Sequence, residues 1–365
     1  MSKAVAAATP IAAVHRWMAN RRLDAVYLTR PVSIAYLTGF RAEPFERLMA
    51  LAVRPDGATL IVPALEAESA RSHASNVDVV AWRDGEDPYA LVSRALGTTT
   101  EIGVEKDHLS LSAAEVITSR TGASELVDVG PEIRRLRLTK HPDEIEKLVR
   151  AAAITDAAGE EVIARLRAGQ KEIDVALMIG SAIGELGGTL SFGSLVQTGP
   201  NSALSHAVPS SRKLAHGDFV LLDFGAAFDG YKADTTRMAV VGEPSARHRE
   251  IHELVLAAHD AAIEAVRPGV TTGDVDAAAR RVIDAAGFGD KFFHRVGHGL
   301  GLEVHEDPSL DPGSRTVLEP GMVFTIEPGV YIAGWGGVRI EDDVVVEEGG
   351  CRVLTKSDRS LRVIA

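Results

Sequence analysis

One predicted β-hairpin constrains the fold of this chain more than any other stretch. Its first strand is the apolar run 219–222, which Asp223 follows at once, and the Asp-Gly dipeptide at 229–230 is typical of a two-residue turn. If that turn forms, Asp223 pairs with Thr236, and the alternation of side chains places Asp223 and Asp234 on one face. Two carboxylates on a buried face repel each other and lose hydration, so the hairpin predicts a cation between them.

Three further candidate ligands follow along the chain. Glu327 ends the apolar strand predicted at 322–326, where the next two residues, Pro-Gly, should stop it, and Glu341 lies near the start of a strand predicted at 338–346. His298 stands between two glycines that let the backbone come close to a site. Any one of these residues alone is most often an ordinary strand-end charge or a structural histidine. Together they indicate a metal cage of Asp223, Asp234, His298, Glu327 and Glu341.

On these motifs the chain resembles the pita-bread metallopeptidases, a family that includes prolidase, aminopeptidase P and methionine aminopeptidase. Its segments VLLDFGA, KADTTR, RVGHGLG, TIEPG and VRIEDDV match that family's Asp, Asp, His, Glu, Glu ligand set one for one. The string HRVGHGLGLEVHEDP at 294–308 is typical of the proline-specific branch, and YLTGF at 36–40 extends the resemblance to the N-terminal part. The resemblance implies an α/β (α+β) protein with a creatinase/prolidase-like N-terminal domain and a pita-bread catalytic domain of pseudo-twofold symmetry.

The pattern of elements predicts the same organisation. A length of 365 residues favours two domains, which we place at 1–133 and 134–365. The first alternates helical and strand patterns, which predicts an α/β sandwich with a sheet of mixed direction, and it holds no ligand cluster. The second repeats a helix pair followed by a hairpin, so that ligands from both halves meet in the middle. The expected helices of this second domain span 142–166, 172–186, 248–266 and 272–286.

Composition excludes several partners. The net charge of −12 argues against nucleic acid or an anionic membrane as a partner. The Ala-rich N-terminus is interrupted by His15 and Arg16, which leaves no apolar segment of signal-peptide or membrane length. The single cysteine, Cys351, excludes an intramolecular disulfide and fits a reducing compartment. We therefore expect a cytoplasmic protein.

The resemblance also implies a chemistry. Two divalent ions balance the carboxylates, with Mn²⁺ fitting an oxygen-rich site best and Co²⁺ or Zn²⁺ as alternatives. In the family pattern Asp234 and Glu341 bridge the two ions, Asp223 binds one of them, and His298 and Glu327 bind the other. A hydroxide that bridges the metals attacks the scissile carbonyl, and Glu327 carries the proton to the departing nitrogen.

Further site residues follow from the same resemblance. The histidines that contact substrate in proline-specific members match His206, His294 and His305, and either His206 or His305 would stabilise the oxyanion. Arg339 also matches, and it is our candidate for binding the free carboxylate of proline. An alternative interpretation makes Arg339 a neutralising neighbour of Asp342 or Asp343. We expect the remaining histidines to be structural or exposed: His73, His108, His216, His248, His252 and His259.

The resemblance implies a homodimeric Xaa-Pro dipeptidase (prolidase) that acts on small peptides with proline in second position. Xaa-Pro aminopeptidase (aminopeptidase P) is the alternative, and methionine aminopeptidase fits less well because it lacks such an N-terminal domain. The charged loop 41–47 could reach a site in a partner subunit or could simply be solvated. A creatinase-like enzyme or a noncatalytic binding module would share the fold, but such proteins are expected to lack the ligands that are intact here.

Overall fold

The chain folds into two compact units, Met1–Arg137 and Leu138–Ala365. The structure, a computed structural model, describes residues 9–204 and 207–365. The domain division predicted between residues 133 and 134 falls within helix α6 (Gly130–Leu138), and we keep it as a proposal.

The first unit is built on a mixed sheet with the strand order β4-β3-β2-β1-β5-β6. Strand β1 pairs antiparallel with β2 and parallel with β5, so the predicted sheet of mixed direction is confirmed. The strands are β1 (Ala25–Leu28), β2 (Ala50–Arg54), β3 (Gly57–Pro63), β4 (Asp78–Trp82), β5 (Glu101–Val104) and β6 (Glu125–Asp128). The helices before α6 are α1 (Pro10–Arg21), α2 (Pro31–Thr38), α3 (Ala67–His73), α4 (Pro88–Leu96) and α5 (Leu111–Thr121).

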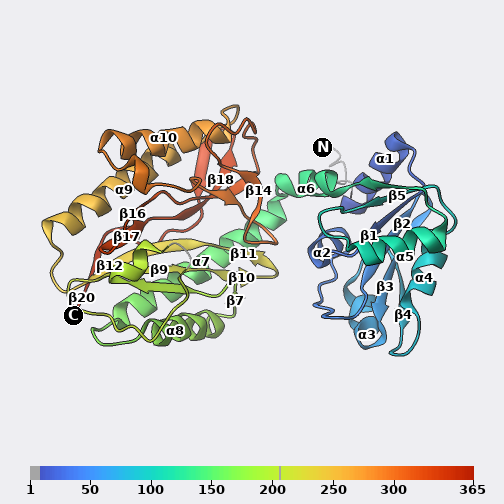
Figure 1. Cartoon of the computed structure of the whole chain (residues 1–365), viewed down its shortest axis with the longest axis horizontal. Helices are drawn as coiled ribbons and strands as arrows, with labels where there is room; N and C mark the ends of the chain where they lie inside the picture. The colour runs from blue at the N-terminus through green and yellow to red at the C-terminus, as the bar shows by residue number, and fades with distance from the viewer. Residues whose placement is uncertain (1–8, 205–206) are drawn as a thin grey trace, which may run out of the picture. The chain divides into compact units, whose positions relative to one another are not determined.

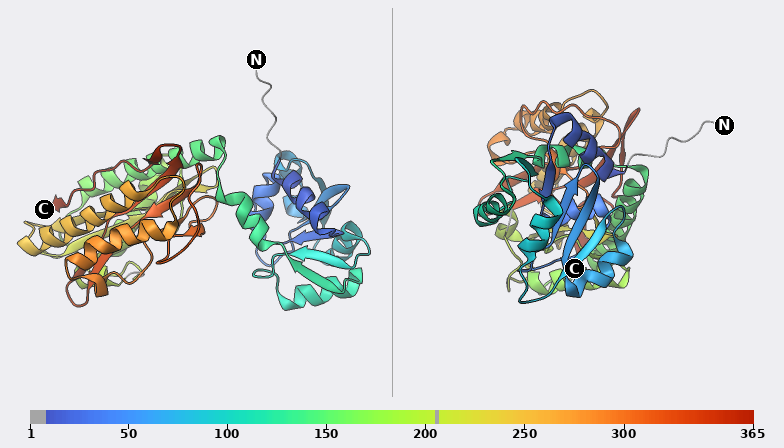
Figure 2. Two further views of the ribbon diagram at one scale, coloured as in Figure 1. Left: turned by 90° about the horizontal axis from the view of Figure 1, so that it is seen from above. Right: turned by 90° about the vertical axis from the view of Figure 1, so that its right-hand side faces the viewer.

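Side-chain alternation explains why helices cover both faces of this sheet. In β1, Val26 and Leu28 pack in a cluster with α1, α2 and α3, whereas Ala25 and Tyr27 pack with α4 and α5. The right-hand view of Figure 2 shows the blue and cyan strands of this sheet side by side with helices beside them. In the charged loop of this unit, Arg47 donates two hydrogen bonds of 3.0 Å to Asp84.

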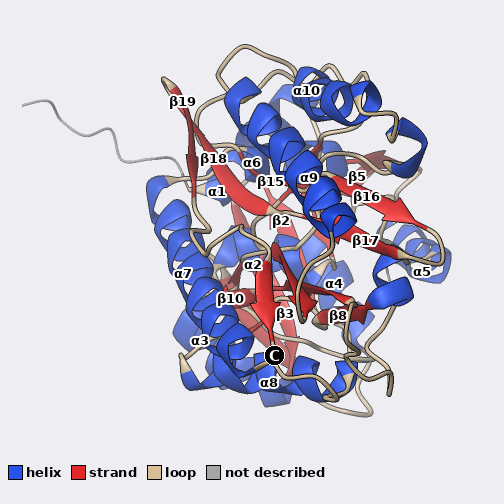
Figure 3. Cartoon of the chain, turned by 90° about the vertical axis from the view of Figure 1, so that its left-hand side faces the viewer, coloured by secondary structure: helices blue, strands red, loops and turns tan. Residues whose placement is uncertain are grey.

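Two helix pairs enclose the strands of the second unit. They are α7 (Pro142–Arg165) with α8 (Glu172–Glu185), and α9 (Ala246–Ala265) with α10 (Thr272–Ala285), as predicted. Figures 1 and 3 show one pair on each side of the strands. Thr271 caps α10 by accepting a hydrogen bond from the backbone N–H of Asp274, which places the start of that helix where its sequence predicts it.

The first hairpin keeps one register from its base to its tip. It consists of β9 (Phe219–Phe224), β10 (Ala226–Phe228), β11 (Tyr231–Lys232) and β12 (Thr235–Val241). Phe228 pairs with Tyr231 across the turn, and Asp223 pairs with Thr236, as predicted. The turn residues Asp229 and Gly230 have φ angles of 46° and 78°, which is the left-handed geometry that a tight hairpin needs.

The second hairpin has the same construction, and it corrects one prediction. Its strands are β15 (Val323–Ile326), β16 (Gly329–Ile332), β17 (Gly336–Arg339) and β18 (Asp342–Glu347). The single strand predicted over 338–346 is therefore wrong, because β17 ends at Arg339 and β18 begins at Asp342. Strand β15 ends at Ile326, as predicted, and a separate strand, β16, follows it. Pro328 has no N–H to donate to the opposite strand, so the ladder breaks there, and Glu341 bridges Thr236 of the first hairpin instead.

Short strands complete the second unit. Strand β20 pairs in parallel with β12, so a late segment of the chain borders the first hairpin. These strands are β7 (Thr189–Leu190), β8 (Leu195–Thr198), β13 (His298–Gly299), β14 (Glu306–Ser309), β19 (Gly350–Val353) and β20 (Arg362–Ile364). Among the described residues, no helix has the length and apolar character needed to cross a membrane.

Candidate metal centre

Each hairpin has a break in its strands, between β9 and β10 in the first and between β15 and β16 in the second. The two hairpins meet beside these breaks, and the predicted ligands gather there. The bridge between Thr236 and Glu341 joins them. A cavity of about 670 Å³ opens beside this bridge. Its lining includes every predicted site residue that the structure describes: Asp223, Asp234, His294, His298, His305, Glu327, Arg339 and Glu341. His206 lies outside the described residues.

The tightest part of this group contains Asp234, His298 and Glu341. Each is buried and offers one ligand atom, and these atoms lie within 4.8 Å of one another. Glu327 extends the group, because its Oε1 lies 3.3 Å from Nε2 of His298. Asp223 also lines the cavity, and the guanidinium of Arg339 donates a hydrogen bond to its Oδ2.

Close backbone packing aims His298 at the acids. A Cβ atom at Gly297 would lie 1.9 Å from the carbonyl oxygen of Thr325, and one at Gly299 would lie 2.1 Å from that of Asp307. Only glycine allows these approaches, as the sequence predicted. Nδ1 of His298 lies 3.1 Å from the carbonyl oxygen of Gly299, which assigns its proton to that nitrogen and turns the Nε2 lone pair toward the carboxylates.

The electrostatics of the cavity favour a bound cation. Burial, together with neighbouring carboxylates, raises the pKa of Asp234 and of Glu341 well above the ordinary range. Burial also raises the pKa of Glu327 to about 7, although Arg339 opposes this shift. Burial and nearby His305 lower the pKa of His298 to about 3, so this imidazole is neutral and able to bind a metal. Metal ions would replace the protons that these acids otherwise hold.

One atom gives a direct test of whether a metal fits. Oδ1 of Asp234 is buried and has no hydrogen-bond partner among the described residues. A buried carboxylate oxygen without a donor is costly unless a cation is bound to it. The donor set of carboxylates and one neutral imidazole therefore fits a pair of divalent ions.

A chain of hydrogen bonds leads away from this centre. The guanidinium of Arg339 donates two hydrogen bonds of 3.0 Å, from Nε to Oγ1 of Thr236 and from Nη1 to the hydroxyl of Tyr331. Nε2 of His294 lies 3.0 Å from the same hydroxyl of Tyr331. The chain therefore connects Asp223, through Arg339 and Tyr331, to His294.

The alternative interpretation of Arg339 is wrong. Asp342 is paired with Arg237 and Arg359, and its second oxygen faces Nε2 of His259 at 3.0 Å. Arg339 points into the cavity instead of toward this group.

The sequence prediction missed Tyr331, although it lines the cavity. The pairing of β16 with β17 could have revealed Tyr331. Gly329 pairs with Arg339, and Tyr331 lies two residues after Gly329, so Tyr331 and Arg339 share one face of the hairpin. The prediction ended the strand before β16 and therefore lost this residue. Arg295, Phe192 and Phe293 also line the cavity and lie outside any recognised ligand spacing.

Comparison with known proteins agrees with this geometry. Residues 146–348 match the model of metallopeptidase family M24, and residues 10–139 match that of the creatinase/prolidase N-terminal domain. The chain belongs to metallopeptidase family M24. The predicted fold, a creatinase-like α/β domain followed by a pita-bread catalytic domain, is thus confirmed, and membership in M24 implies a dinuclear metal site.

Several M24 relatives match almost the whole chain. The Xaa-Pro dipeptidase of Lactobacillus helveticus is 39% identical over 359 residues, which cover 96% of this chain and 98% of that protein. The solved structure of a prolidase from Pyrococcus furiosus has a TM-score of 0.88 at 37% identity and covers 94% of this chain and 100% of that one. An X-Pro aminopeptidase from Thermotoga maritima MSB8 has a TM-score of 0.87 at 32% identity, with 94% and 98% covered. This chain is thus a prolidase-like M24 metallopeptidase.

Proposed function

We propose that this metallopeptidase hydrolyses the Xaa-Pro bond of dipeptides. The observation that carries the proposal is the gathering of buried acids, one neutral imidazole and Arg339 around a single cavity. The sequence similarity of this chain, over nearly its full length, to an Xaa-Pro dipeptidase from Lactobacillus helveticus supports the same substrate class.

In this proposal the metal ligands are the residues that the sequence motifs named. When bound, two divalent ions supply Lewis-acid activation of water and of the scissile carbonyl. Mn²⁺ suits the oxygen-rich donor set best, and Co²⁺ or Zn²⁺ could replace it. The proposed ligands are Asp223, Asp234, His298, Glu327 and Glu341.

Side chains around the ligands supply proton transfer and charge stabilisation. Glu327 is a carboxylate that lines the cavity, with its Oε1 3.3 Å from Nε2 of His298, so it lies where a proton could be passed to a bound substrate. We assign it the transfer of a proton to the departing proline nitrogen. The ring centroid of His305 lies 4.2 Å from that of His298, which supports His305 as the donor to the oxyanion of the transition state. His206 stays a second candidate for that donor.

Proline in second position follows from the chemistry of the bond. An Xaa-Pro bond is a tertiary amide without an N–H, so peptidases that need that donor fail on it. Aromatic residues Phe192, Phe293 and Tyr331 line the cavity and can receive the proline ring, and His294 contacts Tyr331. For a dipeptide, the free carboxylate of proline needs a cationic partner, for which Arg339 is the candidate.

The second candidate function is an Xaa-Pro aminopeptidase. Its support is the similarity of the structure to the X-Pro aminopeptidase from Thermotoga maritima, which is of the same order as the similarity to the prolidase. The two functions differ in whether the residue after proline is admitted.

A peptide assay separates these functions. We expect metal-stripped protein to be inactive, and protein reloaded with Mn²⁺ to cleave Ala-Pro at least about 10-fold faster than Ala-Pro-Ala, because only the dipeptide places its carboxylate beside an arginine. Ala-Ala serves as the control for proline specificity. Equal rates on both proline peptides would favour the aminopeptidase, and inactivity with Mn²⁺, Co²⁺ and Zn²⁺ alike would contradict both. A homodimer and a cytoplasmic location belong to the same proposal, and sedimentation and cell fractionation test them.

A further inference from the structure

We propose that Arg237 and Asp342 form a buried brace that positions Glu341 in the metal centre. The inference rests on the proposed function, since it takes Glu341 to be a metal ligand. Both residues are positioning residues, because neither lines the cavity. Arg237 holds the backbone carbonyls at the bridge, and Asp342 holds the guanidinium of Arg237.

The brace lies directly behind the bridge that joins the two hairpins. Arg237 follows Thr236 in β12, and Asp342 follows Glu341 at the start of β18. Thr236 and Glu341 form the bridge, and the hydroxyl of Thr236 donates a hydrogen bond of 2.6 Å to Oε2 of Glu341. Alternation then turns the next side chain of each strand away from the cavity. There Nη2 of Arg237 donates to Oδ1 of Asp342 over 2.7 Å, and both side chains are buried.

A single guanidinium holds the backbone on both sides of the bridge. Nη1 of Arg237 donates to the carbonyl oxygen of Glu341 over 2.6 Å and to that of Thr236 over 3.0 Å. Its Nη2 also donates to the carbonyl oxygen of Ser357 over 3.1 Å. The hydroxyl of Thr235 adds a second donor to the Glu341 carbonyl, at 3.0 Å. The peptide unit that carries Glu341 is therefore held by two residues of the other hairpin.

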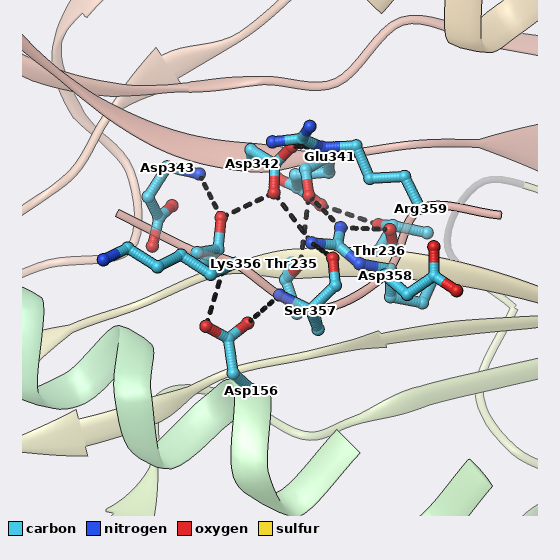
Figure 4. A network of polar contacts seen from close by, with 12 residues as sticks. Asp156, Thr235, Thr236, Glu341, Asp342, Asp343, Lys356, Ser357, Asp358 and Arg359 are labelled. Carbon is cyan, nitrogen blue, oxygen red and sulfur yellow. Dashed lines mark hydrogen bonds and ion pairs between the residues drawn. The ribbon is translucent and has the colours of Figure 1, made fainter. Parts of the chain in front are cut away.

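Asp342 ties this guanidinium to the rest of the unit. Its Oδ1 also accepts a hydrogen bond of 2.7 Å from the hydroxyl of Thr355, while its Oδ2 lies 3.0 Å from Nε2 of His259. The same Oδ2 accepts a hydrogen bond from Arg359, which lies beside Asp342 in Figure 4. The cationic neighbours outweigh the effect of burial and hold the pKa of Asp342 well below its usual range. A parallel link lies beside the brace, because Oδ2 of Asp343 accepts from the backbone N–H of Asp234 over 3.1 Å.

Folding stability alone gives little reason for such a network. Replacing a buried ion pair with apolar residues of similar size is often neutral or even stabilises a protein. In contrast, mutating a residue that hydrogen-bonds a metal ligand typically lowers metal affinity or activity by about 10- to 100-fold. Asp342 lies one residue from the candidate ligand Glu341, and Arg237 lies one residue from Thr236, the bridge partner of Glu341. This position fits the second role.

A matched pair of variants tests the brace. Arg237→Lys keeps the charge but cannot hold Asp342 and the Glu341 carbonyl together, whereas Arg359→Lys changes a cation that contacts Asp342 but not Glu341. Metal-free proteins would be titrated with Co²⁺, and its visible absorption spectrum recorded. We expect the Co²⁺ affinity of Arg237→Lys to fall by about 10-fold or more with an altered spectrum, while Arg359→Lys keeps both. Thermal unfolding of the metal-free proteins reports the purely structural cost of each change.

The outcomes separate the two proposals. If Arg237→Lys folds and binds Co²⁺ as the wild type does, or if Arg359→Lys weakens binding equally, the brace is only structural and the inference is overturned. If Arg237→Lys does not fold, Thr235→Val removes the other donor to the same carbonyl, and unchanged Co²⁺ affinity there also overturns the inference. Failure of the wild type to bind two Co²⁺ ions would instead remove the proposed function.

Discussion

Several side chains of the cavity have pKa values far from the ordinary values of their residue types. Glu327 is the clearest case, because burial raises its pKa from 4.5 to about 7. Between these values the folded protein binds more protons at Glu327 than the unfolded chain does. The stability that this group contributes is therefore full below pH 4.5 and is lost as the pH rises through about 7.

Replacing Glu327 isolates this effect. In metal-free protein, we expect Glu327→Gln to be more stable than the wild type at pH 8 by up to about 3 kcal/mol, with little difference at pH 5, because glutamine cannot ionise. Urea unfolding of EDTA-treated proteins at both pH values measures the difference.

Glu172→Gln is the control. Burial acts against the charge of Glu172, but hydrogen bonds from Ser210 and Thr198 outweigh it and lower its pKa. The cost of that change should therefore be the same at pH 5 and pH 8. A stability difference for Glu327→Gln that does not grow with pH would contradict the assigned shift.

The sequence revealed this site only in part. The spacing of the motifs identified Asp223, Asp234 and Glu341, because each follows or starts an apolar strand. The pairing of Arg237 with Asp342 joins residues 105 positions apart and depends on how the two hairpins meet. Nothing in local spacing encodes that contact. The approach of His259 to Asp342 is equally long-range, so the sequence predicted His259 only as structural or exposed.

At the scale of elements, the centre depends on two interrupted hairpins. The register of the first follows from local chemistry, since Asp229 and Gly230 adopt the positive φ angles that the turn requires. The interruption of the second could not be predicted in the same way. Its break at Pro328 is local, but the position of Glu341 depends on its bridge to Thr236 of the first hairpin.

Gly297 shows how little room these elements leave. We expect Gly297→Ala to lower the free energy of unfolding by more than about 2 kcal/mol and to weaken Mn²⁺ binding, because its Cβ would meet the carbonyl oxygen of Thr325 at 1.9 Å. Gly193→Ala is the matched control, since nothing lies within 4 Å of the Cβ it would add. Urea unfolding and metal titration measure both. Equal stability of the two variants would show that the backbone at Gly297 can shift without cost.

At the scale of the whole molecule, hydrophobic clusters divide between the units. Among the described residues, the buried clusters that involve α1–α6 contain only residues of the first unit, and those around the hairpins contain only residues of the second. Each unit therefore has a core that can fold on its own, which is the usual condition for separate unfolding steps.

Calorimetry of the metal-free protein should accordingly resolve two transitions. We expect Mn²⁺ to raise the free energy of unfolding of the second unit alone, by about 2.7 kcal/mol for each bound ion when the free metal is 100-fold above its Kd. Trp335 reports this unit by fluorescence, whereas Trp17 and Trp82 report the other. A single transition that moves as a whole on metal addition would show that the units unfold together.

Strand β20 has a consequence for how the protein is made. A ribosome synthesises the hairpin of β9 and β12 well before residues 362–364, which later pair with β12. Thr355 and Arg359, which contact Asp342, and Ser357, which accepts from Arg237, are also synthesised late. The N-terminal unit can therefore mature during translation, whereas the pocket for the ions is completed only when these last segments have left the exit tunnel.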